Sequence, residues 1–505
     1  MHQKTGTAVA VASMFAALCI AGLAAAQEAT PSALKGTRPN ILFVFSDDHA
    51  AHAISAYGSQ FARTPNIDRL ASEGVLFRNN FCGNALCGPS RATILTGLHS
   101  HENGFMRNGN VFDGAQTTFP KLLRQAGYAT AIFGKWHLES APQGFDAWAV
   151  LPGQGHYYNP DFETEAGRVR KEGHVTDLTT AMAIDWLERG RDAQKPFLLM
   201  CQHKAPHREW MPALEDLALY RDVQLPEPAT LFDDYSGRIA AAATTEMQID
   251  RDLYLHYDLM VEPTAAERAV AQGPDSWWDG IMARLTDEQR ATFLAAFREE
   301  NEAFRRTKPA GKDLVRWKLQ RYLKNYLRCI AGVDRSVGRL LDWLDAHPDV
   351  KANTIVIYSS DQGFFLGDHG YYDKRWMYEE CLRMPLLLRW PGRVDGPREI
   401  AQLTQNIDFA PTFLELAGVE VPASMHGKSL VPLLAGQKPD DWRTAIYYHY
   451  YESQATHRVP AHYGVRTDRY KLIRYYEPEV DGWELFDLER DPGELKSVAD
   501  DADYR

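Results

Sequence analysis

The sequence predicts an α/β protein, in which helices sandwich a large mixed, mostly parallel β-sheet and a smaller C-terminal subdomain of α+β type carries an antiparallel sheet. Three observations predict this class. The 505 residues are 45% hydrophobic and 24% charged, as in a folded protein with a large core. Short continuous apolar runs alternate with helical patterns along most of the chain, and the pattern changes near residue 438. We therefore expect a large domain over 38–437 and a small subdomain over 438–505.

The first 26 residues predict a secretory signal peptide. A basic start is followed by an apolar stretch over 9–23 and by three alanines at 24–26, which is the small-residue pattern of a cleavage site. A membrane anchor is the alternative, but the apolar stretch is short for a membrane span. We expect a cleaved leader, a secreted or periplasmic mature protein, and no stable membrane insertion.

Five apolar runs predict the strands of the large sheet: 41–45, 129–133, 197–200, 354–358 and 385–388. The runs are continuous, whereas a strand with one face in water alternates apolar and polar residues. Continuous runs are typical of strands that helices cover on both faces, which requires a mostly parallel sheet.

Two segments between these runs predict long packing helices. Thr286 and Gln289 form a capping-box pattern before a helix with Phe293, Leu294, Phe297 and Phe304 on one side. Residues 313–344 carry apolar side chains at near-helical spacing. We expect both helices to face the core.

After residue 438, aromatic and β-branched residues dominate two segments, 446–451 and 470–476, which polar turns separate. This composition favours strands. We expect a small antiparallel sheet at the C-terminus.

The charge balance argues against nucleic acid as a partner. The chain has 55 basic and 67 acidic residues, for a net charge of −12, and it contains no dense run of Lys or Arg. A protein that follows a phosphate backbone needs such a basic patch.

The cysteine count indicates that at least one cysteine has another use or stays free. Cys19 lies in the predicted leader, which leaves an odd number in an oxidising compartment. Four of these five stand beside apolar or aromatic neighbours and are more simply buried small hydrophobic residues than disulfide partners. Cys87 is the exception.

Reactive residue types follow four of the predicted strands: Asp47 and Asp48, then Lys135 and His137, then His203, Lys204 and His207, then Asp361 and Gln362. Ligands of open α/β sheets bind outside the carboxyl ends of the strands. We therefore expect these four groups to meet in one crevice, although each alone would more often be a turn, a cap or a hydrogen-bonded side chain.

Oxygen ligands dominate this set. Asp47, Asp48, Asp361 and Gln362 supply carboxylate and amide oxygens, which favour Ca²⁺ or Mg²⁺ over the nitrogen- and sulfur-preferring Zn²⁺. No Cys/His zinc spacing occurs in the sequence, and calcium is our first choice.

The stretch 86–97 predicts a helix start with unusual chemistry. Pro89 suits the first turn of a helix, so Cys87 would stand just outside the N-terminus, where amide donors and the helix dipole favour an anion. Arg91, one turn further, can reach back toward the same place. The alternative is a plain helix start with a buried thiol.

The pattern Cys87-x-Pro89-Ser90-Arg91, followed by Leu-Thr-Gly at 95–97, resembles the signature of type I sulfatases. The resemblance continues at five further segments: 39–42 leading into Asp47 and Asp48, 134–138, 204–207, 360–363 and 373–375. It spans nearly the whole predicted mature chain and implies an alkaline-phosphatase-like fold for the large catalytic domain.

The resemblance also implies the roles of the site residues. A maturation enzyme would oxidise Cys87 to formylglycine (3-oxoalanine), and Ca²⁺ would bind Asp47, Asp48, Asp361, Gln362 and the modified Cys87. Arg91 would steady the formylglycine hydrate, Lys135 and Lys374 would hold sulfate oxygens, and His137 and His207 would transfer protons. Many sulfatases have Asn or His where this chain has Gln362, which keeps the carbonyl oxygen on a longer side chain.

Four segments, 99–105, 151–155, 203–212 and 462–467, resemble bacterial glucosamine-6-sulfatases. They imply exo-acting removal of 6-O-sulfate from N-acetylglucosamine or glucosamine of heparan sulfate or mucin-type glycans, with His101 and His462 as candidate sugar-binding residues. The enzymatic alternatives are a phosphodiesterase or phosphonate monoester hydrolase, and a sulfatase for another sulfated sugar. A binding protein for sulfated glycans without turnover is the non-catalytic alternative.

Overall fold

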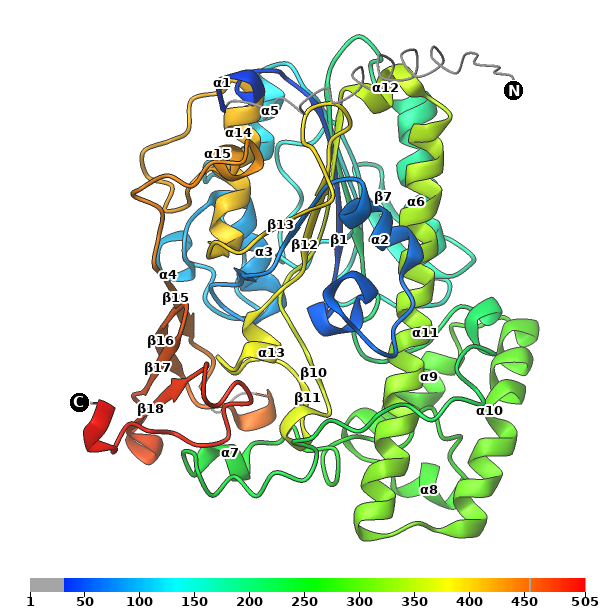
Figure 1. The fold of residues 1–505 in the computed structure, drawn as a ribbon. Helices are drawn as coiled ribbons and strands as arrows, with labels where there is room; N and C mark the ends of the chain where they lie inside the picture. Colours follow the sequence, from blue (N-terminus) through cyan, green and yellow to red (C-terminus); the bar gives the residue numbers. More distant parts are fainter. Residues whose placement is uncertain (1–30, 454–455, 505) are drawn as a thin grey trace, which may run out of the picture.

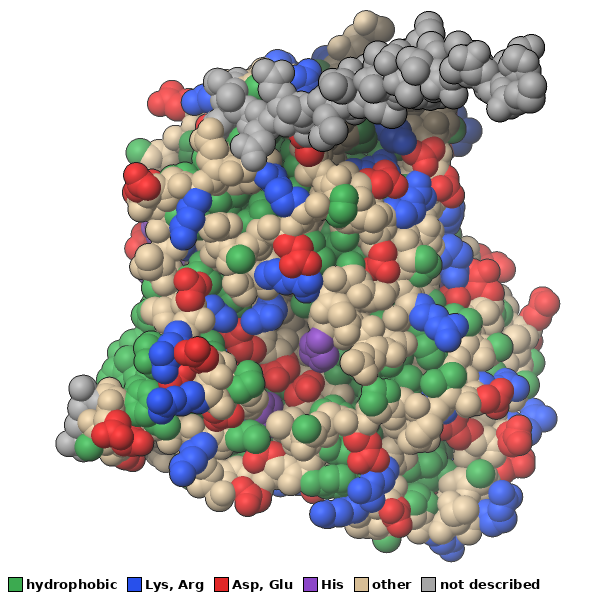
Figure 2. All heavy atoms as spheres, viewed as in Figure 1, with side chains coloured by type: hydrophobic (Ala, Val, Ile, Leu, Met, Phe, Trp, Pro, Cys, Tyr) green, Lys and Arg blue, Asp and Glu red, His purple; other side chains and the backbone are tan. Residues whose placement is uncertain are grey.

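The computed structural model describes residues 31–453 and 456–504, so the predicted signal peptide lies outside the described residues. Within the described part of the chain, no helix is both long enough and apolar enough to cross a membrane. Lys, Arg, Asp and Glu side chains are interspersed over the face in Figure 2.

A ten-stranded mixed sheet forms the centre of the molecule, in the order β13-β2-β12-β9-β1-β8-β4-β5-β6-β7 (Figure 1). Its strands are β1 Asn40–Ser46, β2 Val75–Phe77, β4 Ala129–Lys135, β5 Ala147–Leu151, β6 Asp161–Thr164, β7 Gly167–Arg170, β8 Phe197–His203, β9 Thr354–Ser360, β12 Leu386–Arg389 and β13 Arg398–Ile400. The inner strands β9, β1, β8, β4 and β5 are parallel, and β12 runs antiparallel to β9. The predicted mixed, mostly parallel sheet is confirmed.

Helices cover both faces of this sheet, as the continuous apolar runs predict. They include α2 Pro65–Ser72, α3 Cys87–Thr96, α5 Phe119–Gln125, α6 Val175–Asp185, α11 Gly311–Asp345 and α14 Phe409–Ala417. Ile41 and Phe43 of β1 belong to one buried cluster together with residues of α3, α5 and α14. Leu42 and Val44 belong to the other, which includes residues of α2, α6 and α11. Alternate side chains of one strand therefore serve two cores.

Both predicted long helices exist. Helix α10 spans Asp287–Thr307, and the Thr286 and Gln289 side chains cap its start reciprocally, as predicted. Phe293 and Phe297 are buried, while Leu294 and Phe304 are partly buried. The 313–344 pattern corresponds to α11, whose apolar side packs on the sheet.

Strands β15 Ala445–Tyr450, β16 His462–Thr467, β17 Tyr470–Tyr475 and β18 Gly482–Asp487 form the separate C-terminal sheet. All neighbours in it are antiparallel, as predicted. A boundary at residue 438 stays a prediction. The five described cysteines are buried and free of disulfides, which agrees with the expectation for four of them.

Candidate active site

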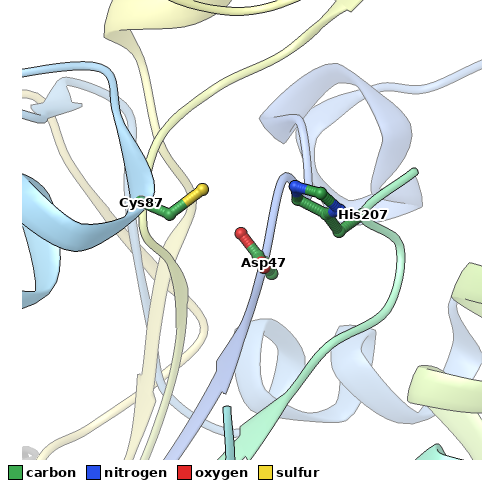
Figure 3. A group of neighbouring side chains, drawn as sticks. All are labelled: Asp47, Cys87 and His207. Carbon is green, nitrogen blue, oxygen red and sulfur yellow. The ribbon is translucent and has the colours of Figure 1, made fainter. Parts of the chain in front are cut away.

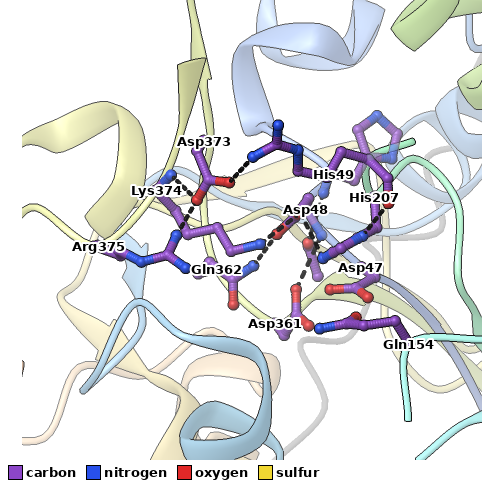
Figure 4. A network of polar contacts seen from close by, with 12 residues as sticks. Asp47, Asp48, His49, Gln154, His207, Asp361, Gln362, Asp373, Lys374 and Arg375 are labelled. Atoms are coloured by element: carbon purple, nitrogen blue, oxygen red, sulfur yellow. Dashed lines mark hydrogen bonds and ion pairs between the residues drawn. The ribbon is translucent and has the colours of Figure 1, made fainter. Parts of the chain in front are cut away.

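Four strands of the large sheet end at one edge, and their reactive residues meet there. Asp47 and Asp48 follow β1, and Asp361 follows the neighbouring β9, with carboxylate oxygens of all three within 4.8 Å of one another. The Asp48 amide donates to Oδ1 of Asp361 at 3.0 Å, and Asp48 takes a φ of 66°, which turns the chain back over the sheet edge. All three carboxylates are fully buried. Figure 4 shows them close together within a network of polar contacts. Lys135 and His203 are the last residues of β4 and β8, whereas the sequence analysis placed them after the strands.

Cys87 points into the same cluster from the start of α3. Its Sγ, an Asp47 oxygen and a His207 ring nitrogen lie within 4.8 Å of one another (Figure 3). Cys87 is the first residue of α3 and Pro89 the third, so the helix begins earlier than the proline alone predicted. Burial raises the pKa of the Cys87 thiol to about 12, so the unmodified side chain is a neutral thiol at pH 7.

Three buried cations surround the carboxylates. Arg91 donates from Nε and Nη2 to Oδ2 of Asp361 at 3.2 and 3.0 Å, Lys374 Nζ lies 2.7 Å from Oδ2 of Asp48, and Lys135 contacts Asp47. Burial holds the pKa of Lys135 well below its usual value. Burial would also lower the pKa of Lys374, but Asp48, Cys87 and Asp373 together outweigh it and hold that pKa above the usual range.

Two histidines lie on the solvent side of the cluster. His207 Nε2 is 3.8 Å from Oδ2 of Asp48, and its Nδ1 contacts the carbonyl oxygen of Arg208. His137 Nε2 lies 3.3 Å from Nε2 of Gln154, and its Nδ1 has no partner. The two histidines are 7% and 8% exposed, while the carboxylates are at 0%, so the histidines are the less enclosed part of the cluster. Burial, together with the charge of Lys135, lowers both histidine pKa values.

The residues present fit a hard divalent cation. Asp47 Oδ1 and Gln362 Oε1 are buried without a hydrogen-bond partner. Burial raises the pKa of Asp48 to about 7, against the charge of Lys374 and with support from Asp361, because three carboxylates share one dry space. A cation would give the unpartnered oxygens a ligand contact and would reduce the repulsion among the three carboxylates. The Gln362 amide nitrogen now faces Oδ1 of Asp48, and a half-turn of the amide would present its oxygen there.

A polar border that sequence reasoning did not select adjoins Lys374. Asp373 Oδ1 accepts from the Lys374 amide at 2.8 Å and contacts Arg375, while its Oδ2 lies 3.3 Å from His457 Nε2. Arg208 Nη1 lies 3.3 Å from the same His457 nitrogen and 3.9 Å from Oδ2 of Asp373. The segment 373–375 carries the family resemblance, so Asp373 and Arg375 could have been predicted as site residues. No motif in the sequence surrounds His457.

Gln154 is a second residue that was not selected. Its Oε1 accepts from Lys135 Nζ at 2.5 Å, and its amide nitrogen adjoins His137. It stands in the segment 151–155, which the sequence analysis used only for the sugar resemblance.

The two candidate sugar-binding histidines lie outside this cluster. His462 is fully buried, with its ring among Trp376, Tyr448 and Tyr475, and its Nδ1 lies 2.8 Å from the Pro460 carbonyl oxygen. Direct contact between His462 and a sugar is therefore inconsistent with the structure, because the core of the small sheet encloses the ring. His101 is exposed and contacts Tyr451 of the C-terminal region.

A mixed sheet with acidic residues, a helix-start cysteine and cations at one edge defines an enzyme of the alkaline-phosphatase-like class. The structure of a phosphonate monoester hydrolase from Agrobacterium radiobacter shares this fold, with a TM-score of 0.63 at 23% identity over 92% of each chain. The family model "Sulfatase" matches residues 39–419, and "N-sulphoglucosamine sulphohydrolase, C-terminal" matches 367–505. The chain belongs to the sulfatase family and is a sulfuric ester hydrolase.

A sequence relative and a solved structure that resemble this chain are both described by a sulfated glucosamine or N-acetylglucosamine. The chain is 46% identical to an N-acetylglucosamine-6-O-sulfatase of Bacteroides thetaiotaomicron, over 96% of this chain and 87% of that protein. A structure solved in complex with its substrate D-glucosamine-2-N,6-O-disulfate has a TM-score of 0.88 and 47% identity, and the match covers 92% of this chain and 94% of the other.

Proposed function

We propose that this protein is an exported, exo-acting sulfatase that removes 6-O-sulfate from N-acetylglucosamine or glucosamine of heparan sulfate or mucin-type glycans. We further propose that Cys87 is oxidised to formylglycine by a maturation enzyme and that Ca²⁺ is the metal. The observation that carries the proposal is the single buried cluster of Cys87, the three carboxylates and the buried cations. The similarity to an N-acetylglucosamine-6-O-sulfatase supports the choice of sugar.

Different residues of the cluster would take different roles in sulfate ester hydrolysis. Asp47, Asp48, Asp361, Gln362 and the modified Cys87 would hold Ca²⁺, which would supply positive charge beside the sulfuryl oxygens. One hydroxyl of the hydrated aldehyde of residue 87 would attack sulfur, giving its proton to a neighbouring carboxylate as the bond from sulfur to the sugar oxygen breaks. The second hydroxyl would then lose its proton, release sulfate and restore the aldehyde. Arg91 would steady that hydrate through its position beside Asp361.

The other side chains act on the ester itself. Lys135 and Lys374 would bind the sulfate oxygens, where charge develops as the S–O bond breaks. His207, with Nε2 facing the cluster, would protonate the departing sugar oxygen, and His137 would accept the proton of the second hydroxyl. Sugar hydroxyls would bind to the buried polar border that adjoins Lys374. This border consists of Asp373, Arg375, Arg208 and His457.

The first experiment measures sulfate release from N-acetylglucosamine-6-sulfate by protein that is co-expressed with a maturation enzyme and supplied with Ca²⁺. We expect turnover that Cys87→Ala abolishes without loss of the fold, because the change removes one small side chain from the crevice. Activity of Cys87→Ala within a few-fold of wild type would refute the formylglycine mechanism.

Two controls separate the alternatives. The mass of the peptide containing residue 87 reports whether formylglycine has formed, and the assay counts only when it has. Phosphate release from a matched phosphate ester that exceeds sulfate release would instead support a phosphodiesterase or phosphonate monoester hydrolase.

A further inference from the structure

The outer side of the C-terminal sheet carries a cluster of tyrosine and histidine rings. Strand alternation turns Tyr447 and His449 of β15 and Tyr463 of β16 outward, and Tyr476 continues this side just beyond β17. Tyr451 follows β15, and His101 joins it from α4 Ser100–Asn103, which is distant in the sequence. We call these six residues the histidine–tyrosine surface. In Figure 2 the hydrophobic colour class, which includes tyrosine, gathers at the lower left, where Figure 1 has β15–β18.

Mutual contacts hold these rings in place. His449 and Tyr451 stack with centroids 3.7 Å apart. The two ring nitrogens of His449 contact the hydroxyls of Tyr447 and Tyr476 at 2.8 and 2.9 Å, and Nδ1 of His101 lies 3.2 Å from the Tyr451 hydroxyl. The rings nevertheless reach solvent, since Tyr476 is 41% exposed and the His101 side chain 42%. The other four rings are half-buried. A fixed set of partly exposed rings is prepared for contact with a ligand at small entropic cost.

Two hydrogen bonds connect the segment that carries this surface to the start of α3, where Cys87 lies. Tyr451 precedes Glu452, whose Oε1 accepts from the Asn108 amide at 2.9 Å. Oδ1 of Asn108 in turn accepts from the amide of Gly88 at 3.1 Å, and Gly88 follows Cys87. Two hydrogen bonds therefore connect the residue next to the nucleophile with the residue next to Tyr451.

The chemistry of the six rings suits a sugar. The tyrosine rings have apolar faces that can stack on the C–H face of a pyranose, and their hydroxyls can bond sugar hydroxyls. His449 holds the tyrosines in place, because both of its ring nitrogens contact tyrosine hydroxyls and its ring stacks on Tyr451. Burial, with a smaller effect of His101, lowers the pKa of His449 to about 4, so its ring is neutral near pH 7. Exposed aliphatic side chains, such as Val465 and Leu472, lie further along the same side of the sheet, outside the six rings.

We infer that the histidine–tyrosine surface binds a glycan chain several sugars away from the residue that loses its sulfate. This inference rests on the proposed function in one respect, that the substrate is a glycan. It assigns a secondary binding site for oligosaccharides, which a monosaccharide substrate in the crevice does not reach.

The test compares two substrates in the double variant His449→Ala/Tyr476→Ala. The variant removes both members of one hydrogen-bonded pair, and the half-buried Tyr447, which loses its contact with His449, can bond water instead. We expect kcat/KM on a 6-O-sulfated heparan hexasaccharide to fall about 10-fold, mainly through KM, as for loss of stacking contacts. Activity on N-acetylglucosamine-6-sulfate should stay within about 2-fold. Val465→Ala, a change on the same exposed side of β16, should alter neither substrate.

An unchanged hexasaccharide KM, or an equal loss on both substrates, would overturn the inference. Binding of the hexasaccharide to full-length Cys87→Ala protein, with and without the double change, gives a readout that needs no turnover. We expect about a 10-fold higher Kd with the double change. If the proposed sulfatase function failed, this difference would remain. If instead the double change abolished a dimer in sedimentation and left the Kd unchanged, the surface would be a self-association site.

Discussion

At the scale of single residues, His207 illustrates how the backbone orients a reactive group. Its Nδ1 contacts the carbonyl oxygen of the next residue, Arg208, so Nε2 faces Asp48 and the crevice. This arrangement makes Nε2 the nitrogen that can exchange a proton with a ligand beside Asp48. The proposed role as general acid therefore depends on one nitrogen in one direction.

Replacing His207 should affect substrates according to their leaving group. We expect His207→Ala to lower kcat on N-acetylglucosamine-6-sulfate by about 10²–10⁴-fold, because an alkoxide needs a proton as it leaves. On 4-nitrophenyl sulfate, whose phenolate leaves without a proton, the loss should be much smaller. Steady-state kinetics on both esters provides the measurement, and equal losses would show that His207 does not act as the acid.

Sequence reasoning worked for residues inside local patterns and missed residues that loops bring in. Cys87 and Arg91 share one helix start, and Asp47 and Asp361 follow neighbouring strands, so local pattern and strand direction place them. Gln154 reaches Lys135 from the loop after β5, and no local pattern sets the path of that loop. His462 was misassigned because strand alternation turns it toward the core, a direction that depends on the register of β16.

At the scale of secondary-structure elements, helix α10 follows its sequence signals closely. The Thr286 hydroxyl accepts from the Gln289 amide at 3.2 Å, and the Gln289 side chain accepts from the Thr286 amide at 2.9 Å. Gln289 also accepts from Asn159 at 2.8 Å, so the cap joins α10 to the segment before β6. Four consecutive residues are enough to predict this cap. The contact between Gln289 and Asn159 cannot be predicted from them, because Asn159 is distant in the sequence.

Removing this cap should weaken the fold without altering the chemistry. We expect Thr286→Ala to reduce the free energy of unfolding by about 1 kcal/mol, because the Gln289 amide loses its acceptor. Activity should be unchanged, since α10 supplies no residue to the crevice described above. Urea unfolding followed by circular dichroism measures the loss. Thr286→Ser keeps the hydroxyl and should be nearly neutral, so an equal loss in Thr286→Ser would contradict this explanation.

At the scale of the whole molecule, the C-terminal region completes the site of the large domain. The Tyr448 hydroxyl donates to the Arg375 carbonyl at 2.6 Å, and Glu452 contacts the Asn108 amide near Cys87. His457 adjoins Asp373. The sequence predicted the small sheet from its composition, but its docking on the crevice depends on contacts between residues far apart in the chain. The class of the large fold could therefore be predicted from the sequence. The positions of Arg208 and His457 beside Asp373 could not.

Residues far apart in the chain also meet around His369, and we expect this contact to make stability sensitive to alkaline pH. This histidine lies in a 3-10 turn, Asp368–Gly370, where it is fully buried, with Nδ1 3.2 Å from Oδ2 of Asp233 and Nε2 3.8 Å from Oε2 of Glu380 of α13 Glu379–Leu382. Burial alone would lower its pKa, and so would the charge of Arg238, but the two carboxylates outweigh both and raise the pKa to about 9.

Because the folded pKa of His369 exceeds the unfolded value of 6.5, the folded state binds the proton more tightly. The stabilisation is then fully present below pH 6.5 and disappears as the pH rises through about 9. A pKa shift of this size corresponds to a contribution of at most roughly 3 kcal/mol to the free energy of unfolding. We expect the free energy of unfolding of wild type to exceed that of His369→Gln at pH 6, and this difference to shrink by up to that amount between pH 6 and 9.5. Urea unfolding at each pH measures both proteins. The comparison with His369→Gln cancels the other titrating groups, such as Glu494. Parallel pH profiles of the two proteins would show that His369 is not charged in the folded state.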